Sequence, residues 1–206
     1  MTDDTDVTVL IVEDEQQIAD GYASILRDRY TVKTAYSGEQ ALETIDDDVD
    51  VVLLDRMMPG LSGRETLTEF REAGFECPVA MVTAKVPDFD VIEMGFDDYL
   101  TKPVDVDELE DTVERLIALG RLDPSVRAFV ADTIKQASLE ANKPSVELST
   151  SEDYQGLRDR LSSQGAELGD ISAAMTDEEF ELVLQTIVRN LGDGQDGQGQ
   201  DSLDQL

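Results

Sequence analysis

Several polar residues that could bind a divalent cation and a phosphoryl group stand at the ends of short apolar runs. The acids are Glu13 and Asp14 after the run 7–12 and Asp55 after the run 51–54; the others are Thr83 after 79–82 and Lys102 after 99–101. Three carboxylates packed together repel one another unless a cation lies among them. Mg²⁺ prefers oxygen ligands of this kind. The set therefore predicts a magnesium site with a nucleophilic carboxylate, a hydroxyl and an ammonium beside it.

Apolar runs separated by stretches with helical spacing are typical of buried parallel strands. In such sheets the carboxyl ends of the strands meet at one edge, where ligands bind. The sequence predicts an α/β fold, a doubly wound (βα)5 five-stranded parallel sheet with right-handed crossovers, followed by a small all-α segment. The expected strands are 7–12, 31–36, 50–54, 78–82 and 97–101. The expected helices of the sheet domain are 15–28, 38–46, 63–74, 86–94 and 105–119.

Four motifs occur in a fixed order, each at a predicted strand. They are Glu13-Asp14, Asp55-Arg56-Met57-Met58-Pro59-Gly60, Val82-Thr83-Ala84 and Gly95-Phe96-Asp97-Asp98-Tyr99-Leu100-Thr101-Lys102-Pro103. Over about residues 6–119 the chain resembles the receiver domain of two-component response regulators, which has a flavodoxin-like fold. The resemblance implies a regulatory phosphoacceptor, not an enzyme with a separate substrate. Its phosphoryl donor would be a sensor histidine kinase.

The resemblance also implies a role for each residue. Asp55 is the expected phosphoryl acceptor, and Mg²⁺ is expected on Glu13, Asp14, Asp55 and the backbone carbonyl of Met57. Lys102 should pair with Asp55 at rest and with the phosphoryl oxygens afterwards, and the peptide bond before Pro103 is usually cis in the family.

The expected switch residues are Thr83 and Tyr99. On phosphorylation Thr83 moves inward in the family, and Tyr99 then turns from an exposed to a buried position. We expect the response to be read at the face from about Val86 to Asp111.

The composition is strongly acidic. The chain has 206 residues, with 47 Asp and Glu against 16 Lys and Arg, for a net charge of −31. The excess runs through both halves of the sequence, which favours a halophilic surface adapted to a salt-rich cytoplasm. The N-terminus has no signal-peptide pattern and no run is long enough to span a membrane, so we expect a cytoplasmic protein. The single cysteine, Cys77, excludes an internal disulfide, and the absence of histidine excludes a phosphohistidine carrier.

The rest of the chain is predicted to be helical. We expect a polar lead at 1–6, the receiver at 7–120, a helical domain at 121–191 and a disordered acidic Gly/Gln tail at 192–206. The helical part resembles the HalX domain of haloarchaeal regulators. The matching residues are Ala137-Ser138-Leu139-Glu140-Ala141-Asn142-Lys143, Glu147-Leu148, Ser151-Glu152-Asp153-Tyr154 and Leu157-Arg158-Asp159-Arg160-Leu161.

A repeat of apolar residues at three- and four-residue steps starts at Tyr154 and ends at Met175, within a predicted helix that begins near Ser151. Such a heptad seam packs either within one chain or between two copies. Gly156, Gly165 and Gly169 should weaken this helix. A capping box at 176–179 precedes a third amphipathic stripe at 180–191. A homodimer could therefore form through the helical segment 151–175 or through the receiver face 86–111.

Two other functions remain open at this point. A DNA-binding transcription regulator of the same receiver class is one, although the few basic residues of 121–191 make nucleic acid an improbable partner. A Mg²⁺-dependent phosphatase with an Asp nucleophile is the other. Such phosphatases usually carry a second Asp two residues after the nucleophile, where this chain has Met57.

Overall fold

The computed structural model describes residues 7–171, with side chains to residue 166. The described chain forms two compact units, one with residues 7–86 and 93–131 and the other with 87–92 and 132–171. The first unit holds a parallel sheet with the strand order β2-β1-β3-β4-β5. Its strands are β1 (Thr8–Val12), β2 (Thr31–Ala35), β3 (Val51–Asp55), β4 (Val79–Thr83) and β5 (Asp98–Thr101). The predicted five-stranded doubly wound sheet is confirmed.

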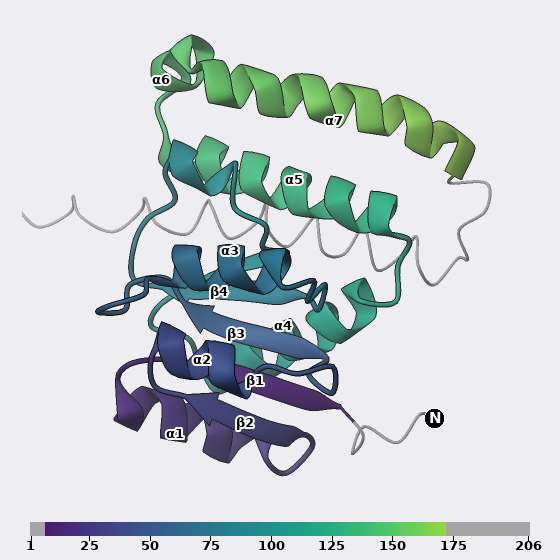
Figure 1. Cartoon of the computed structure of the whole chain (residues 1–206). Helices are drawn as coiled ribbons and strands as arrows, with labels where there is room; N and C mark the ends of the chain where they lie inside the picture. Colours follow the sequence, from purple (N-terminus) through teal and green to yellow (C-terminus); the bar gives the residue numbers. More distant parts are fainter. Residues whose placement is uncertain (1–6, 172–206) are drawn as a thin grey trace, which may run out of the picture. The chain divides into compact units, whose positions relative to one another are not determined.

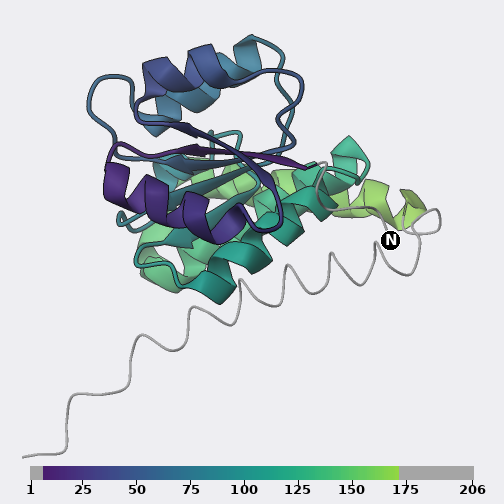
Figure 2. The ribbon, with the colours of Figure 1, turned by 90° about the horizontal axis from the view of Figure 1, so that it is seen from below.

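Four helices cover the two faces of this sheet. They are α1 (Gln16–Leu26), α2 (Gly38–Thr44), α3 (Gly63–Glu72) and α4 (Val106–Leu119). Helices α1 and α4 contact each other on one face, and α2 and α3 contact each other on the opposite face (Figures 1 and 2). The central strands β1, β3 and β4 are buried along their whole length, as expected for strands covered on both sides.

Polar caps fix where several of these helices begin. The side chains of Ser37 and Asp105 accept hydrogen bonds from backbone N–H groups of α2 and α4. Ser62 and Glu65 form a capping box at the start of α3. The caps hold the helix N-termini beside the carboxyl edge of the sheet, where the candidate site lies.

The predicted helix at 86–94 is wrong. This part of the chain holds only the 3₁₀ turn η2 (Phe89–Val91), with the Val91 and Ile92 amides donating to the carbonyls three residues earlier. Pro87 disfavours helical backbone at Val86, and Gly95 ends the segment. The residues between them include the β-branched pair Val91 and Ile92, which lowers helix propensity further.

The first two turns of helix α5 (Pro124–Asn142) belong to the sheet-bearing unit. Arg127 donates to both carboxylate oxygens of Asp97, which is 4% exposed, and to the carbonyl of Glu76. A bidentate guanidinium–carboxylate pair fixes orientation as well as distance. The compact unit of the structure ends at residue 131, whereas the domain boundary at residue 120 stays a prediction.

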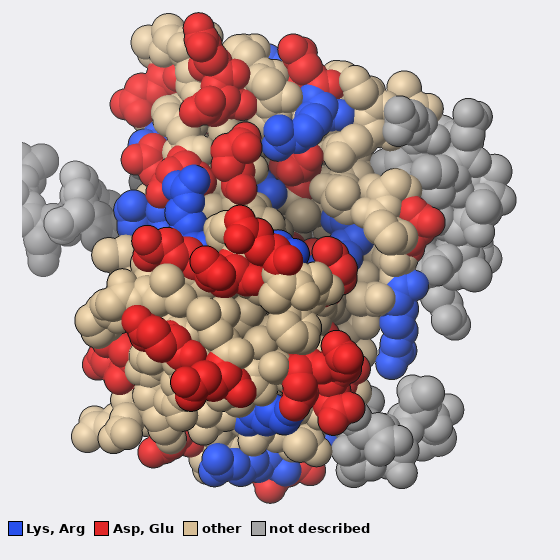
Figure 3. Space-filling model, viewed as in Figure 1, with Lys and Arg blue, Asp and Glu red and all other residues tan. Residues whose placement is uncertain are grey.

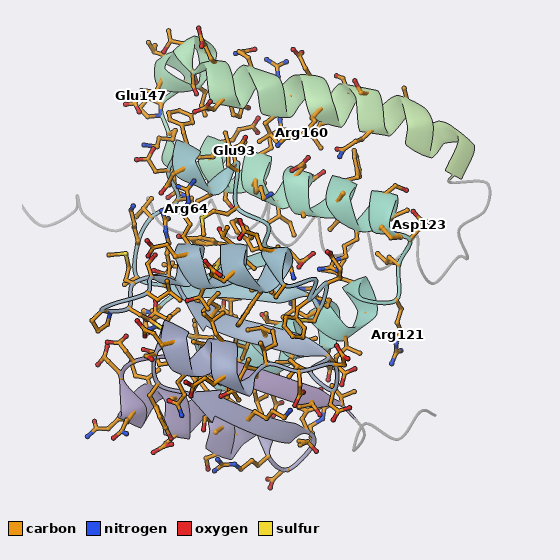
Figure 4. The ribbon with its side chains drawn as sticks, viewed as in Figure 1. Arg64, Glu93, Arg121, Asp123, Glu147 and Arg160 are labelled. Atoms are coloured by element: carbon orange, nitrogen blue, oxygen red, sulfur yellow. The ribbon has the colours of Figure 1, made fainter. Side chains whose placement is uncertain are left out.

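The second unit contains the C-terminal half of α5, helix α6 (Ser145–Thr150) and helix α7 (Glu152–Ile171). Arg160 of α7 points toward α5 and bonds Asp132, while the Tyr154 hydroxyl donates to Glu140 (Figure 4). The later residue of α7 pairs with the earlier residue of α5, so these two helices run antiparallel. Tyr154 and Leu157 are buried, which shows that the start of the heptad seam packs within the chain.

Two details of these helices differ from expectation. Helix α6 lies within the predicted helical domain but is not predicted as a separate element, and α7 continues past Gly156, Gly165 and Gly169 without a break. The lead at 1–6, the capping box at 176–179, the stripe at 180–191 and the tail at 192–206 lie outside the described residues. Within the described part of the chain, no helix combines the length and apolar character needed to cross a membrane.

Gly63 permits α3 to begin directly against the end of β3. A Cβ atom there would lie 2.1 Å from the Asp55 carbonyl oxygen, and that oxygen belongs to rigid backbone. We expect Gly63→Ala to lower the free energy of unfolding by about 3 kcal/mol through overpacking. Gly21→Ala is the matched control, because a Cβ at Gly21 in α1 has no atom within 4 Å. It should raise stability by about 0.5–1 kcal/mol, measured by urea unfolding. Equal effects of the two substitutions would contradict the packing at Gly63.

Acidic side chains cover much of the viewed surface, both over the sheet-bearing unit and over the C-terminal helices (Figure 3). Their mutual repulsion opposes the compact state and is screened by salt. We expect the thermal midpoint to rise by more than about 5 °C, or about 2 kcal/mol, between low salt and multimolar KCl. Sucrose is the control, because it does not screen charge. A thermal midpoint that does not change with KCl would contradict a surface adapted to salt.

Candidate phosphoacceptor site

The carboxyl edge of the sheet gathers three carboxylates. Glu13 and Asp14 follow β1, and Asp55 ends β3, the strand paired with β1. One oxygen from each carboxylate lies within 4.8 Å of one from each of the others. Glu13 is 2% exposed and Asp55 is 6% exposed, so two of these charges are largely removed from water.

Lys102 joins two of the acids. Its Nζ donates to Glu13 Oε2 at 2.6 Å and to Asp55 Oδ2 at 2.7 Å. It follows β5, and the peptide bond between Lys102 and Pro103 is cis, as the sequence resemblance predicts. One ammonium thus bridges strand ends that are far apart in the sequence.

Burial raises the pKa of Glu13 to about 7, and the nearby Asp55 charge adds to this rise while Lys102 opposes it. Burial alone would lower the pKa of Lys102, but its hydrogen bonds to Asp55 and Glu13 raise that pKa above its ordinary value. One ammonium therefore faces two buried carboxylates and the less buried Asp14. This excess of negative charge, made entirely of oxygen ligands, fits a hard divalent cation such as Mg²⁺.

The loop after β3 forms a hydrogen bond with the Asp55 carboxylate. The Met57 amide donates to Asp55 Oδ1 at 2.9 Å, so Oδ1 and Oδ2 each have a different partner. The Met57 side chain is 62% exposed. The use of its backbone carbonyl as a metal ligand stays a prediction.

The two predicted switch residues meet at the backbone of Lys85. Thr83 is fully buried, and its Oγ1 accepts a hydrogen bond from the Lys85 amide at 3.2 Å. The half-buried Tyr99 donates its hydroxyl to the Lys85 carbonyl. Sequence reasoning named Thr83 and Tyr99 separately but did not find this shared contact, because no pattern in the sequence records it.

A second feature that sequence reasoning missed is a mainly apolar groove of about 460 Å³ beside Lys102. It lies between α1 and the segment after β5, and its lining residues include Ile18, Tyr22, Ile25 and Val104. The spacing of Ile18, Tyr22 and Ile25 on one helix face is the signal that could have indicated it. Burial raises the pKa of Tyr22.

An open parallel α/β sheet with an acidic cluster and a lysine at its carboxyl edge is the architecture of a receiver. Residues 9–114 match the family model of the response regulator receiver domain, and residues 118–184 match that of the HalX domain. The chain therefore belongs to the response regulator family, with a receiver domain followed by a HalX domain.

Curated relatives agree with this assignment. A putative transcriptional regulator of Haloferax volcanii is 44% identical over 160 residues, covering 77% of this chain and 27% of that protein. The transcriptional regulatory protein DltR of Streptococcus agalactiae is 37% identical over 149 residues, covering 70% of this chain and 64% of that protein. The chain thus spans less than two thirds of the length of these relatives.

Solved structures are also similar. The signal receiver domain of a putative Luxo repressor protein from Vibrio parahaemolyticus has a TM-score of 0.52 at 25% identity, covering 56% of this chain and 92% of that one. A BeF3-activated DrrB receiver domain has a TM-score of 0.50 at 32% identity, covering 54% and 97%. These similarities concern the receiver part of the chain.

Proposed function

We propose that this protein is a two-component response regulator that accepts a phosphoryl group on Asp55. The observation that carries the proposal is the Lys102 ammonium bridging Glu13 and Asp55, with Asp14 beside them. A sensor histidine kinase is the proposed donor. An Asp55 carboxylate oxygen would attack the phosphorus, the phosphorus–nitrogen bond to the kinase histidine would break, and the leaving imidazole nitrogen would keep the electron pair.

The proposed metal ligands are Glu13, Asp14, Asp55 and the Met57 carbonyl. Bound Mg²⁺ would supply positive charge that offsets the negative charge of the incoming phosphoryl group. The chain's own contribution is to hold Asp55 in place, through the Met57 amide on Oδ1 and Lys102 on Oδ2. After transfer, Lys102 would turn from the carboxylate to the new phosphoryl oxygens.

We infer that the phosphoryl group shifts a population of states already present in the free protein. In the state described here, Lys85 is hydrogen bonded by both Thr83 and Tyr99. A hydroxyl that accepts from the Lys85 amide can also donate to a phosphoryl oxygen, so a Thr83 side chain drawn toward that oxygen would shift its contact with Lys85. Tyr99 would then move with the backbone of Lys85.

We propose that the helical HalX domain is the output of the protein and that phosphorylation changes its self-association. Tyr154 and Leu157 are buried, which disfavours the start of the segment 151–175 as a dimer surface and favours the part of the receiver face 86–111 that lies outside Pro87–Ile92. Val86 and Val106 on that face are 54% and 49% exposed.

Light scattering in molar KCl with Mg²⁺ tests this function. The protein is measured with and without beryllofluoride, the reagent named in the activated state of the similar DrrB receiver domain. We expect the mass to rise in the wild-type protein and to stay constant in Asp55→Asn. An equal rise in both would contradict the role of Asp55, and a constant mass in both would remove the dimer proposal.

A DNA-binding output is the second candidate, because the curated relatives are named transcriptional regulators. The charges of the described C-terminal helices give it little support. A carboxylate pairs with each of four basic side chains of this region, namely Arg127, Lys135, Lys143 and Arg160. A gel shift in molar salt, with and without beryllofluoride, distinguishes the two outputs: a shift that depends on beryllofluoride would establish the DNA-binding one.

A further inference from the structure

The segment that follows Lys85 belongs to the C-terminal unit, although its neighbours in sequence belong to the sheet. The chain leaves the sheet-bearing unit after Val86, contributes Pro87–Ile92 to the helical unit, and returns at Glu93. Val91 and Ile92 are 1% and 3% exposed. The helical unit is thus completed by a loop that starts at the candidate switch.

Lys143, which directly follows α5, contacts two residues of the segment Pro87–Ile92. Its Nζ lies 2.9 Å from Asp88 Oδ1 and 5.3 Å from the centre of the Phe89 ring. Asp88 also caps η2 by accepting from the Phe89 amide. One cation therefore holds the start of η2 through a carboxylate and through a ring face at the same time.

The same cation reaches the next helix. Lys143 Nζ lies 3.8 Å from Glu147 Oε2 in α6, and the Lys143 amide continues the hydrogen bonding of α5 by donating to the Leu139 carbonyl. The Lys143 side chain is 19% exposed, whereas the side chains of Asp88 and Glu147 are 51% and 55% exposed, so salt screens both ion pairs in part. Lys143 is the meeting point of η2, α5 and α6.

Only Val86 and Pro87 separate Asp88 from Lys85, whose amide and carbonyl bond Thr83 and Tyr99. Pro87 fixes its own φ angle and restricts Val86 before it, so this link is stiff. Fewer backbone angles are therefore left to absorb a displacement of Lys85 before it reaches Asp88.

We propose that Lys143 is a latch that couples the switch residues of the receiver to the HalX helices through Pro87–Ile92. The inference rests on the proposed function, because it needs a phosphoryl-dependent change at Thr83 and Tyr99. Coupling of this kind is reciprocal, so the helical unit in turn biases the conformation of Lys85. The conformation of the HalX helices would then change in response to phosphorylation before any partner binds.

Hydrogen exchange of the full chain tests the latch, in molar KCl with Mg²⁺ and with or without beryllofluoride. In the wild type, we expect beryllofluoride to change exchange both in the peptides at 83–87 and in the peptides of α6 and the start of α7. In Lys143→Met the change at 83–87 should persist, whereas the change in α6 and α7 should fall by about fivefold or more. Methionine keeps an unbranched apolar stem of nearly the same length as lysine and removes the ammonium with its charge and hydrogen-bond donors.

Two further variants control for simple damage to the helices. Lys143→Arg keeps the cation and the contact with the Phe89 ring, so it should respond as the wild type does. Arg158→Met removes a charge from an exposed position of α7 and should also leave the response intact. Rescue by arginine separates a latch from a residue that only stabilises the fold.

The outcomes separate the latch from the proposed function. A Lys143→Met protein whose α6 and α7 respond as strongly as the wild type would overturn the latch. A wild-type protein that responds at 83–87 but not in α6 or α7 would also overturn it, while leaving phosphorylation of Asp55 intact. A wild-type protein whose exchange at 83–87 does not change with beryllofluoride would remove the proposed switch at Thr83 and Tyr99, and the latch with it.

Discussion

Asp55→Asn should reduce phosphoryl incorporation by at least about a hundredfold, which corresponds to about 2.7 kcal/mol of lost transition-state stabilisation. An amide is neutral and a poor nucleophile, and the change also removes one of the three carboxylates that could hold the metal. The measurement is incorporation of label from a small acyl phosphate with Mg²⁺, so that no kinase need be known. Asp111→Asn is the matched control, because Asp111 carries the same charge at an exposed position of α4.

The same variant makes a prediction about stability. Without Mg²⁺, the Asp55 charge opposes that of Glu13, whose pKa is raised to about 7 mainly by burial and also by Asp55. Removing one of two neighbouring like charges relieves this repulsion. We therefore expect the unfolding midpoint of Asp55→Asn to be no lower than that of the wild type in Mg²⁺-free buffer. Early unfolding would mean that the lost label reports a damaged fold and not a missing nucleophile.

Lys102→Ala should separate phosphorylation from its structural consequences. Asp55 and the other carboxylates remain, so label should still be incorporated. The ammonium that bridges Glu13 and Asp55 is absent, so the phosphoryl group has no partner that draws the end of β5 toward it. We expect hydrogen exchange at Thr83 and Tyr99 to stop responding to beryllofluoride. A full response in this variant would contradict the role given to Lys102.

Lys102→Ala should also lower the Mg²⁺-free free energy of unfolding by about 3 kcal/mol, because it leaves two buried carboxylates without their cation. Mg²⁺ should restore much of this loss, since it would occupy the same cluster of charge. Lys33→Ala is the matched control: Lys33 pairs with Asp46, whose side chain is 52% exposed, so its loss should cost less than about 1 kcal/mol. Equal losses in the two variants would contradict a buried charge cluster at Lys102.

The sequence was sufficient to predict the sheet and the residues along its edge. Glu13, Asp55, Thr83 and Lys102 each follow an apolar run, and parallel strands carry the ends of such runs to one side. The spatial meeting of Lys102 with Glu13, 89 positions earlier, follows from that rule alone. The caps at Ser37, Ser62 and Asp105 are residue types that commonly begin helices.

Local patterns did not predict features that depend on packing between distant segments. The expected helix at 86–94 failed because Pro87 restricts Val86 and the β-branched Val91 and Ile92 lower helix propensity, and the segment belongs to the helical unit instead. Nothing in the sequence links Lys143 to Asp88, since they lie on different elements and have no shared period. The limits of the domains, at residues 120 and 191, stay predictions for the same reason.

The central claim is that Asp55 is the phosphoryl acceptor of a metal-dependent site. Its most direct test is to phosphorylate the full chain with a small acyl phosphate in molar KCl, reduce the acyl phosphate with borohydride, and map the modified peptide by mass spectrometry. The account predicts modification at Asp55 that depends on Mg²⁺. Modification at another residue, or at Asp55 to the same extent without a divalent cation, would contradict it.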